Sequence, residues 1–211
     1  MVSDSVYKDL DKANKKNFKD LIKLFDKKMY KKSLKKCEAI LGTQPNHGET
    51  VAMKALIYNT VGKKKEAYEL INKALMCNIQ SFTSWNIKGM IDTSDRNFTD
   101  ATKCFAQSAR IEDDNQKLIR DLLLLELQVR DTAGAVNSIS KIMQKQARNK
   151  VYCTCYFLVN HLQGNYEVAE TFIDQNRDFL LNNLSRVEIN ELCMYEASLY
   201  RDHGKYEQAI K

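Results

Sequence analysis

The sequence contains few of the residues that build sheets and tight loops. Its 211 residues include one proline, Pro45, and seven glycines. Such low usage argues against most sheet-and-turn architectures. No run of eighteen apolar residues occurs, and the longest candidate, residues 122–127, is interrupted by Glu126, so no membrane-spanning helix is expected. The first residues lack a basic segment followed by an apolar one, so no secretory leader is expected either.

Groups that carry out catalysis are also scarce. The three histidines, His47, His161 and His203, are far apart and have no nucleophile beside them in the sequence. We interpret His47 as a polar residue at a helix start. The basic segment after Gly62 lacks the glycine spacing of a phosphate-binding loop. We therefore expect no catalytic residue, no cofactor and no small-molecule substrate.

Cysteine is present but does not form a ligand pattern. The six cysteines are Cys37, Cys77, Cys104, Cys153, Cys155 and Cys193. Without a secretory leader a disulfide framework is not expected, and most of these thiols should be reduced and at least partly buried in helices. Cys153 and Cys155 form a C-x-C motif, but no second cysteine pair follows, which favours free thiols over a metal site.

Small residues recur with one period along most of the chain. Ser33, Ala67, Ala101, Ala135 and Ala169 follow one another at a constant interval. That interval, about 34 residues, is typical of the tetratricopeptide repeat, a unit of two helices joined by a turn. One such unit cannot bury its apolar face alone, so units stack. The sequence predicts an all-α tetratricopeptide-repeat solenoid of antiparallel helix pairs, wound as a right-handed superhelix, and favours a scaffold function.

The third repeat shows the packing pattern most completely. Trp85, Gly89, Phe98, Ala101 and Phe105 occupy consensus positions 4, 8, 17, 20 and 24. Small residues at positions 8 and 20 let the two helices approach, and large residues fill the remaining space. The packing positions assigned in the other repeats are Ser33, Ala55, Ala67, Ala135, Tyr166 and Ala169.

The same register predicts where helices begin. The first helices of the five repeats should open near Asn14, Gly48, Phe82, Gln116 and Lys150. Asn46 with Glu49, and Ser185 with Glu188, have capping-box spacing, and Ser81 is a candidate cap.

After the fifth repeat the period slips. The register places the next small residue at position 203, but the matching alanine, Ala209, comes six residues later. The six extra residues fit either a longer helix or the loop at Asn182 and Asn183. We expect a basic lead-in at 1–13, five repeats at 14–180, and the start of a sixth, truncated repeat at 181–211 that would continue in a longer solenoid.

Positive charge is concentrated at the beginning of the chain. Residues 1–36 contain twelve lysines and five aspartates, a net charge of +7, whereas the whole chain carries +6. Lys12, Lys16, Lys19, Lys23 and Lys27 follow helical spacing and form a stripe along one helix. The following helix adds Lys31, Lys32, Lys35 and Lys36. These nine lysines are either the solvated outer face of a terminal repeat or a surface that a polyanion neutralises.

Residues 47–131 resemble a particular family beyond the repeat consensus. Three strings are not required by repeat packing: HGETVAMK from His47, GKKKEAYEL from Gly62 and LIRDL from Leu118. Together with Trp85, Gly89 and the ATKCF string from Ala101, they resemble the auxiliary (large) subunit of the N-terminal acetyltransferase A complex. A weaker, collinear resemblance extends from about Phe18 to Lys211, at the subunit's N-terminal end.

The resemblance implies a non-catalytic scaffold. Members of this family bind and activate a small catalytic acetyltransferase subunit and anchor it to the ribosome, where the complex acetylates nascent chains that begin with small residues. It implies a cytoplasmic, ribosome-associated protein, with the catalytic subunit bound mainly by later repeats and the nine lysines as candidate rRNA contacts. The acetyl-CoA-binding pattern of acetyltransferases, Arg/Gln-x-x-Gly-x-Gly/Ala, does not occur in this sequence.

Two alternatives have no ribosome role. One is a generic tetratricopeptide interaction scaffold. The other is a chaperone co-factor that clamps a peptide carboxylate, which needs Lys and Asn at positions 5 and 9 of one first helix. The first three repeats instead offer Phe18 and Ile22, Ala52 and Leu56, and Asn86 and Met90.

Overall fold

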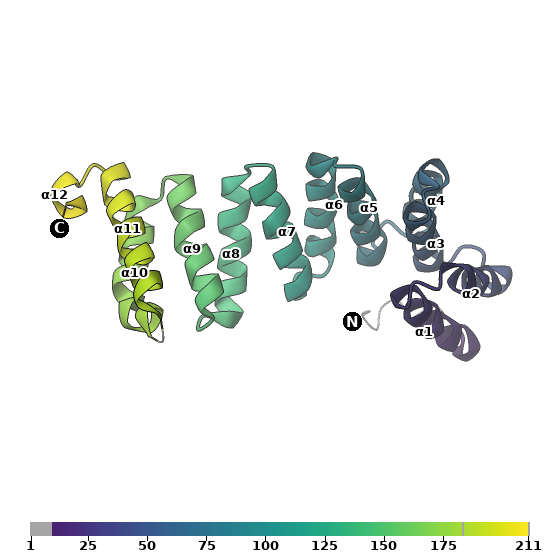
Figure 1. The fold of residues 1–211 in the computed structure, drawn as a ribbon. Helices are drawn as coiled ribbons and strands as arrows, with labels where there is room; N and C mark the ends of the chain where they lie inside the picture. The colour runs from purple at the N-terminus through teal and green to yellow at the C-terminus, as the bar shows by residue number, and fades with distance from the viewer. Residues whose placement is uncertain (1–9, 183, 211) are drawn as a thin grey trace. The chain divides into compact units, whose positions relative to one another are not determined.

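The computed structural model describes residues 10–182 and 184–210, which form twelve α-helices and no strand. The chain divides into two compact units, Met1–Leu118 and Ile119–Lys211. The first unit holds α1 (Lys12–Asp26), α2 (Tyr30–Thr43), α3 (Gly48–Thr60), α4 (Lys64–Cys77), α5 (Phe82–Ser94) and α6 (Phe98–Ile111) (Figure 1). Helix α7 (Gln116–Gln128) crosses the boundary between the units. The second unit holds α8 (Thr132–Gln146), α9 (Lys150–Gln163), α10 (Tyr166–Leu181), α11 (Arg186–Asp202) and α12 (Tyr206–Ala209).

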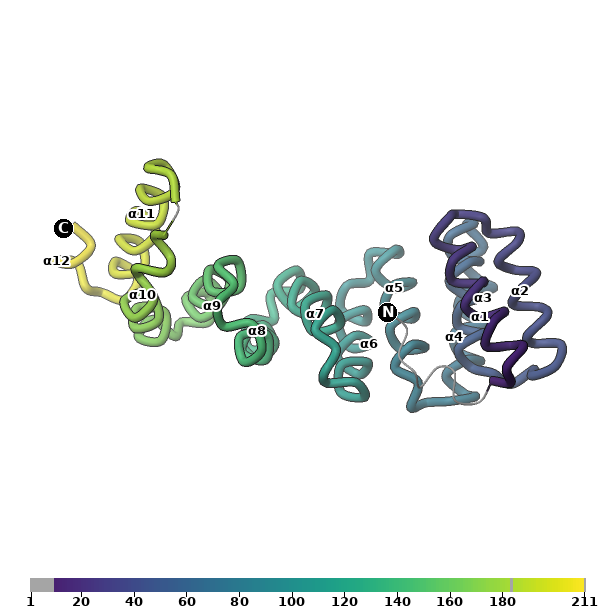
Figure 2. Tube along the Cα trace, turned by 90° about the horizontal axis from the view of Figure 1, so that it is seen from below, coloured from purple at the N-terminus to yellow at the C-terminus, as the bar shows by residue number. Residues whose placement is uncertain are grey.

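The helices pack as consecutive pairs, as the repeat register predicts. In the first unit α1 packs on α2, α3 on α4 and α5 on α6, and the pairs are joined through α2 with α3, α3 with α5 and α4 with α5 (Figure 2). In the second unit α8 packs on α9, α9 on α10 and α11 on α12.

Four of the five predicted starts of first helices are confirmed to the residue. Helices α3, α5, α7 and α9 begin at Gly48, Phe82, Gln116 and Lys150. Helix α1 instead begins at Lys12, two residues before Asn14, because the Asp11 side chain caps it by accepting a hydrogen bond from the Asn14 backbone N–H at 2.7 Å. Residues 1–9 of the expected lead-in lie outside the described part of the chain.

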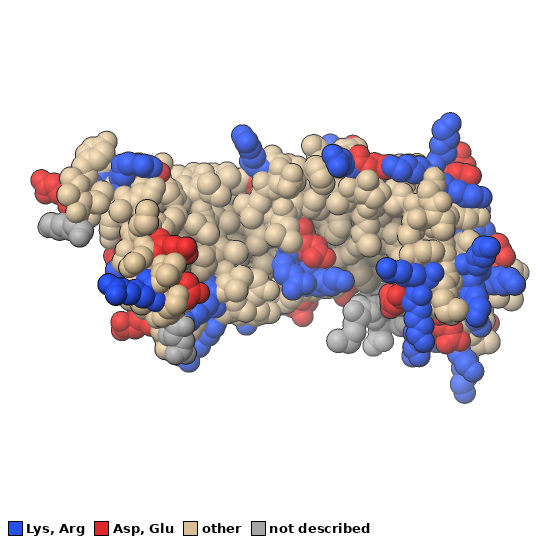
Figure 3. Space-filling view, viewed as in Figure 1, with Lys and Arg blue, Asp and Glu red and all other residues tan. Residues whose placement is uncertain are grey.

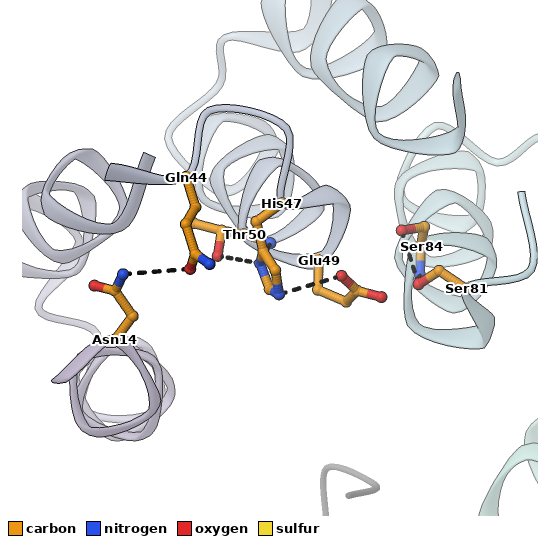
Figure 4. A network of polar contacts seen from close by, with 7 residues as sticks. All are labelled: Asn14, Gln44, His47, Glu49, Thr50, Ser81 and Ser84. Atoms are coloured by element: carbon orange, nitrogen blue, oxygen red, sulfur yellow. Dashed lines mark hydrogen bonds and ion pairs between the residues drawn. The ribbon is translucent and has the colours of Figure 1, made fainter. Parts of the chain in front are cut away.

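The predicted caps are correct at two helices and wrong at one. Ser185 and Glu188 form the reciprocal capping box at α11, and the Ser81 side chain caps α5. Asn46 does not cap α3. Its neighbour His47 does, because the His47 Nδ1 atom accepts a hydrogen bond from the Thr50 backbone N–H at 3.2 Å. Figure 4 shows His47 with Thr50 at the start of α3, Ser81 with Ser84 at the start of α5, and Asn14 of α1 directed toward Gln44.

The small residues of the repeat register lie at buried crossings of the helices. Ser33, Ala67, Ala101, Ala135 and Ala169 are each fully buried. Ser33 also uses its hydroxyl group, which donates to the Leu21 carbonyl oxygen of α1 at 3.1 Å. The register therefore marks the positions where the second helix of each pair meets the first.

The close approach of α5 and α6 depends on Gly89. A Cβ atom built on Gly89 would lie 2.4 Å from Cδ2 and Cε2 of Phe105. Phe105 is 5% exposed and occupies the space that any side chain at position 89 would need. Ala55, at the same repeat position in α3, is also buried. The large residues Trp85, Phe98 and Tyr166 are only half-buried.

The turn inside each repeat has one backbone geometry. A residue just after each first helix has a positive φ: Lys28 (58°), Gly62 (85°), Arg96 (60°), Arg130 (62°) and Gly164 (85°). These five positions recur with the same period as the small residues. At Gly62 the backbone N–H donates to the Asn59 oxygen at 3.0 Å, and the N–H of Lys63 donates to the Tyr58 oxygen at 2.9 Å. This Schellman pattern closes the helix C-terminus.

Three of the six extra residues after the fifth repeat lie in a longer helix, and the others flank it. Helix α11 begins at Arg186, whereas the register counted from the start of α9 places it at residue 184, so two of the six precede the helix. The next turn glycine, Gly204, shows the whole offset, because the register counted from Gly164 places that turn at residue 198. Three of the remaining four residues belong to α11, which has 17 residues against 14 in α9 and so gains about one helical turn. The fourth is its C-cap, His203, which precedes the turn glycine.

Candidate functional site

The predicted lysine stripe lies on the solvent side of α1. Lys12, Lys16, Lys19 and Lys23 of α1 are exposed, as is Lys27 at its C-cap. Figure 3 shows Lys and Arg side chains gathered on the surface formed by α1 and α2. Among the described residues, no carboxylate lies within ion-pair distance of Lys12, Lys16, Lys23 or Lys27.

The opposite face of α1 explains why the lysines point outward. Asn14, Phe18 and Leu21 are buried, and Ile22 and Phe25 pack against the same core. Burial of this apolar face fixes the rotation of α1. The lysine stripe is therefore held on the surface by the packing of the helix, at a cost of mutual repulsion between the lysines.

The lysines of α2 are not all alike. Lys31, Lys32 and Lys35 are exposed. Lys36 is half-buried, and its Nζ atom donates to Asn17 Oδ1 at 2.9 Å and lies 3.9 Å from Asp20 Oδ2. Lys36 thus joins α2 to α1. The other eight of the nine candidate lysines are exposed side chains of α1, its C-cap and α2, which we together call the lysine face: Lys12, Lys16, Lys19, Lys23, Lys27, Lys31, Lys32 and Lys35.

The cysteines are free thiols, and burial suppresses thiolate formation at two of them. Burial raises the pKa of both the Cys37 and the Cys104 thiol to about 12, so neither forms a thiolate near neutral pH. Cys153 is also buried and Cys155 is half-buried, so most of the cysteines are at least partly buried, as expected, whereas Cys77 and Cys193 are exposed. In residues 10–182 and 184–210, no group of three or more His, Cys, Asp and Glu side chains could hold a metal ion.

The histidines hold helices together. His47 caps α3, as its interpretation as a helix-start residue predicts. His161 of α9 lies 2.8 Å from the Tyr195 hydroxyl of α11 and 3.1 Å from Asp202. His203 lies 2.8 Å from the carboxylate of Glu170 in α10. Each ring is thus used in packing within its own unit.

The carboxylate of Glu170 is the centre of one of these contacts. It is 7% exposed and accepts hydrogen bonds from His203 and from Lys205, the latter at 2.6 Å. Burial alone would raise the pKa of this carboxyl group, but the hydrogen bonds from Lys205 and His203 outweigh burial and lower the pKa below its usual value. Glu170 therefore stays ionised and ties α10 to the segment after α11.

Sequence reasoning missed a polar groove in the first unit. It has a volume of about 720 Å³ and lies between α4 and α6, with α5 beneath. Trp85, Lys88 and Asp92 of α5 line it, as do Asp100 and Arg110 of α6. Tyr68 and Asn72 of α4 complete the lining. The lining therefore comes from two repeats, so only the assembled helices bring it together. The one sequence signal was that the sole tryptophan is followed three residues later by a lysine.

Within the described part of the chain, no helix is both long and apolar enough to cross a membrane. The eight exposed lysines of the lysine face are the strongest candidate for a macromolecular contact. Their geometry suits a charged partner at the surface and carries no reactive group.

Comparison with known proteins gives the family. The family model described as "Psidin, N-terminal TPR repeats region" matches residues 15–182. The chain is 32% identical over 198 residues to the N-terminal acetyltransferase A complex auxiliary subunit NAA15 of Arabidopsis thaliana. It is 31% identical over 198 residues to N-alpha-acetyltransferase 16, NatA auxiliary subunit, of Mus musculus. These matches cover 92% of this chain but only 22% and 23% of the two relatives, so the chain spans less than a quarter of their length.

Solved structures agree with this grouping. The structure described as "Structure of Naa15/Naa10 bound to HypK-THB" contains a chain 31% identical to this one with a TM-score of 0.88, covering 93% of this chain and 30% of that one. A likeness to pilF of Pseudomonas aeruginosa, at 14% identity and a TM-score of 0.61 over 94% of this chain and 87% of that one, shows the repeat fold alone. The chain therefore belongs to the family described as the Psidin N-terminal TPR repeats region, and its resemblance to auxiliary subunits of N-terminal acetyltransferase A is confirmed.

Proposed function

We propose that this chain is a repeat scaffold of an N-terminal acetyltransferase A auxiliary subunit, which binds and activates a catalytic acetyltransferase subunit and anchors it to the ribosome for co-translational N-terminal acetylation. The names of its relatives and of the Naa15/Naa10 structure support the assignment to this complex. The protein would accordingly act in the cytoplasm, on ribosomes.

The scaffold role is supported by the way the chain uses its reactive side chains. The three histidines are engaged in a helix cap and in contacts between helices. The thiols of Cys37 and Cys104 are held protonated by burial. Chemistry on the substrate would therefore come from the catalytic partner. The purified chain, incubated with acetyl-CoA and a peptide beginning with serine, should transfer no acetyl group above background.

The lysine face is the one observation that supports the proposed ribosome contact. The stripe on α1 runs from Lys12 to Lys27, so it is roughly 22 Å long at about 1.5 Å per residue. Such a length can meet several consecutive phosphates of an RNA strand. Contacts of this kind neutralise the backbone and release counterions, so they are independent of sequence and sensitive to salt.

The test is ribosome co-sedimentation of the full subunit at increasing salt. Lys16→Glu, Lys19→Glu and Lys23→Glu together reverse the charge at the centre of the stripe. We expect the triple variant to leave ribosomes at low salt, where the wild type still sediments. Helicity should be unchanged because glutamate is about as good a helix former as lysine. Each lost phosphate contact should lower the slope of log affinity against log salt by about 0.7–0.9.

A matched control separates a local contact from a general loss of charge. Lys65, Lys73 and Lys117 are exposed lysines of the same unit outside the lysine face, and their change to Glu alters the net charge equally. This control should sediment as the wild type does. Equal sedimentation of the two triple variants and the wild type at every salt concentration would show that the lysine face is only solvated, and would favour a scaffold without a ribosome role. Activation of the catalytic partner in free solution should survive in both variants.

A further inference from the structure

The groove in the first unit has a defined chemical polarity. We call it the Trp85 groove. Helices α5 and α6 are antiparallel neighbours, so the start of α5 lies beside the end of α6. Trp85 and Arg110 therefore line one end and Lys88 lies midway along α5. The other end is lined by Asp92, Asn97 and Asp100 together with one cation, Lys103. The charge of the groove changes sign along its length.

The carboxylates of the groove have hydrogen-bond or ion-pair partners within the protein, whereas two of its cations have no carboxylate partner in the described part of the chain. The Asp100 carboxylate is bound by Lys103 at 2.8 Å and by the Asn97 amide at 2.8 Å. Asp92 is 3% exposed and accepts hydrogen bonds from the Tyr68 hydroxyl at 3.0 Å and the Cys104 thiol at 3.6 Å. Both carboxylates thus already have donors within the protein.

Lys88 and Arg110, by contrast, lack charged partners within residues 10–182 and 184–210. Neither has a carboxylate within ion-pair distance among the residues that the structure describes. The Lys88 Nζ atom lies 5.7 Å from the centre of the Trp85 ring, a cation–π distance. The groove therefore presents two cations without acidic partners beside the half-buried face of an aromatic ring, in a recess walled by two helices.

The walls add groups that match a peptide backbone. Asn72 of α4 and Gln107 of α6 line the groove, and a side-chain amide both donates and accepts hydrogen bonds. Trp85 and Asp92 are separated by two turns of α5, about 10 Å along the helix axis. An extended peptide of three to four residues, at about 3.3 Å each, has that length.

From these features we propose that the Trp85 groove binds a short extended segment of a partner protein, with an acidic side chain on Lys88 and Arg110 and an apolar side chain on Trp85. The change of charge sign favours a peptide over RNA. A uniform polyanion that reached Lys88 and Arg110 would continue into Asp92 and Asp100, whereas a peptide can place its acidic residue at one end only. This assignment does not depend on the ribosome contact of the lysine face.

Trp85 makes the experiment specific, because it is the only tryptophan of the chain. Its fluorescence reports the groove directly. The probes are the tetrapeptide acetyl-Glu-Leu-Glu-Leu-amide, the matched acetyl-Lys-Leu-Lys-Leu-amide and a four-nucleotide oligouridylate, each titrated into the chain to millimolar concentration. We expect a saturable change of Trp85 emission with the acidic peptide alone.

The variants locate the contact. Lys88→Gln with Arg110→Gln should weaken binding of the acidic peptide about tenfold, since two partly shielded ion pairs are lost. Lys65→Gln with Lys73→Gln removes the same charge from exposed positions of the same unit outside the groove and should leave the affinity unchanged. Circular dichroism of both pairs verifies folding.

Several results would overturn the proposal. One is no change of Trp85 emission with the acidic peptide, and another is equal binding of the lysine peptide. A third is equal loss of affinity in both double variants, which would indicate general electrostatic attraction. A fourth is preferential binding of oligouridylate that the groove variants abolish, which would make the groove a nucleic-acid site instead.

Discussion

Replacing Gly89 with alanine tests whether the small residue at position 8 sets the distance between paired helices. In an ordinary helix interior this change is stabilising by about 1 kcal/mol, because glycine loses more backbone freedom on folding. At Gly89 the new Cβ atom would meet two ring carbons of Phe105 at 2.4 Å. The ring is almost fully buried, so it can retreat only by displacing its neighbours. Overpacking of this kind costs about 1–3 kcal/mol.

Gly42 provides the matched control. It lies near the end of α2, and a Cβ atom built there meets no atom within 4 Å. Gly42→Ala should therefore stabilise the protein by up to about 1 kcal/mol. Since the helix-propensity effect is shared, the difference between the two variants measures the clash itself, about 1–3 kcal/mol.

Urea unfolding followed by Trp85 emission is a suitable assay, because Trp85 lies on the same helix as Gly89. Gly89→Ala should lower the midpoint and Gly42→Ala should raise it slightly. In a Phe105→Leu background the ring atoms are gone, so Gly89→Ala should no longer be destabilising. If Gly89→Ala raises the midpoint as much as Gly42→Ala does, the close approach of α5 and α6 does not depend on glycine, and the reasoning fails.

Three further changes test other contacts. Arg96→Gly should stabilise the first unit by about 0.5–1 kcal/mol, because a positive φ strains any residue with a Cβ atom. Gly62→Ala should destabilise the same unit for the same reason. Chemical denaturation measures the free energy of unfolding of both variants. Arg177→Ala removes two hydrogen bonds, at 2.8 and 3.0 Å, from the buried carboxylate of Glu196, and should lower the thermal midpoint of the second unit by a few degrees. The lowered pKa of Glu170 stabilises the folded state fully above the ordinary glutamate pKa of about 4.3, and this contribution is lost as the pH falls through the lower folded-state value. Glu170→Gln should therefore flatten the decline of stability with acid, as denaturation at a series of pH values would show.

The register and most helix starts could be predicted because they depend on local rules. A helix crossing admits only a small side chain, so Ala67 and Ala101 reveal the packing by their size alone. Ser81 and Ser185 cap the helices that directly follow them. The failure at Asn46 has the same origin, since its spacing to Glu49 suggested a cap, whereas the ring nitrogen of the next residue, His47, fills that role.

Features that depend on backbone conformation or on several helices were not predictable. Nothing in the identity of Lys28, Arg96 or Arg130 indicates a left-handed backbone, because the turn geometry is imposed by the helices on either side. The Trp85 groove needs α4, α5 and α6 in place before its lining residues come together. The lysine face, by contrast, was predictable in position, and only the engagement of Lys36 with Asn17 and Asp20 required the assembled pair of helices.

The recurring turn has a consequence for how the length of this protein can change over evolutionary time. A deletion of residues 62–95 would join Val61 directly to Arg96, a residue that already adopts the positive φ needed after a first helix. A tandem duplication of the same segment would create a junction of the same kind. Unequal recombination can therefore add or remove whole repeats, and the residue at the new junction of the protein needs no new backbone conformation. Such proteins should differ in length by whole repeats more readily than by fractions of one.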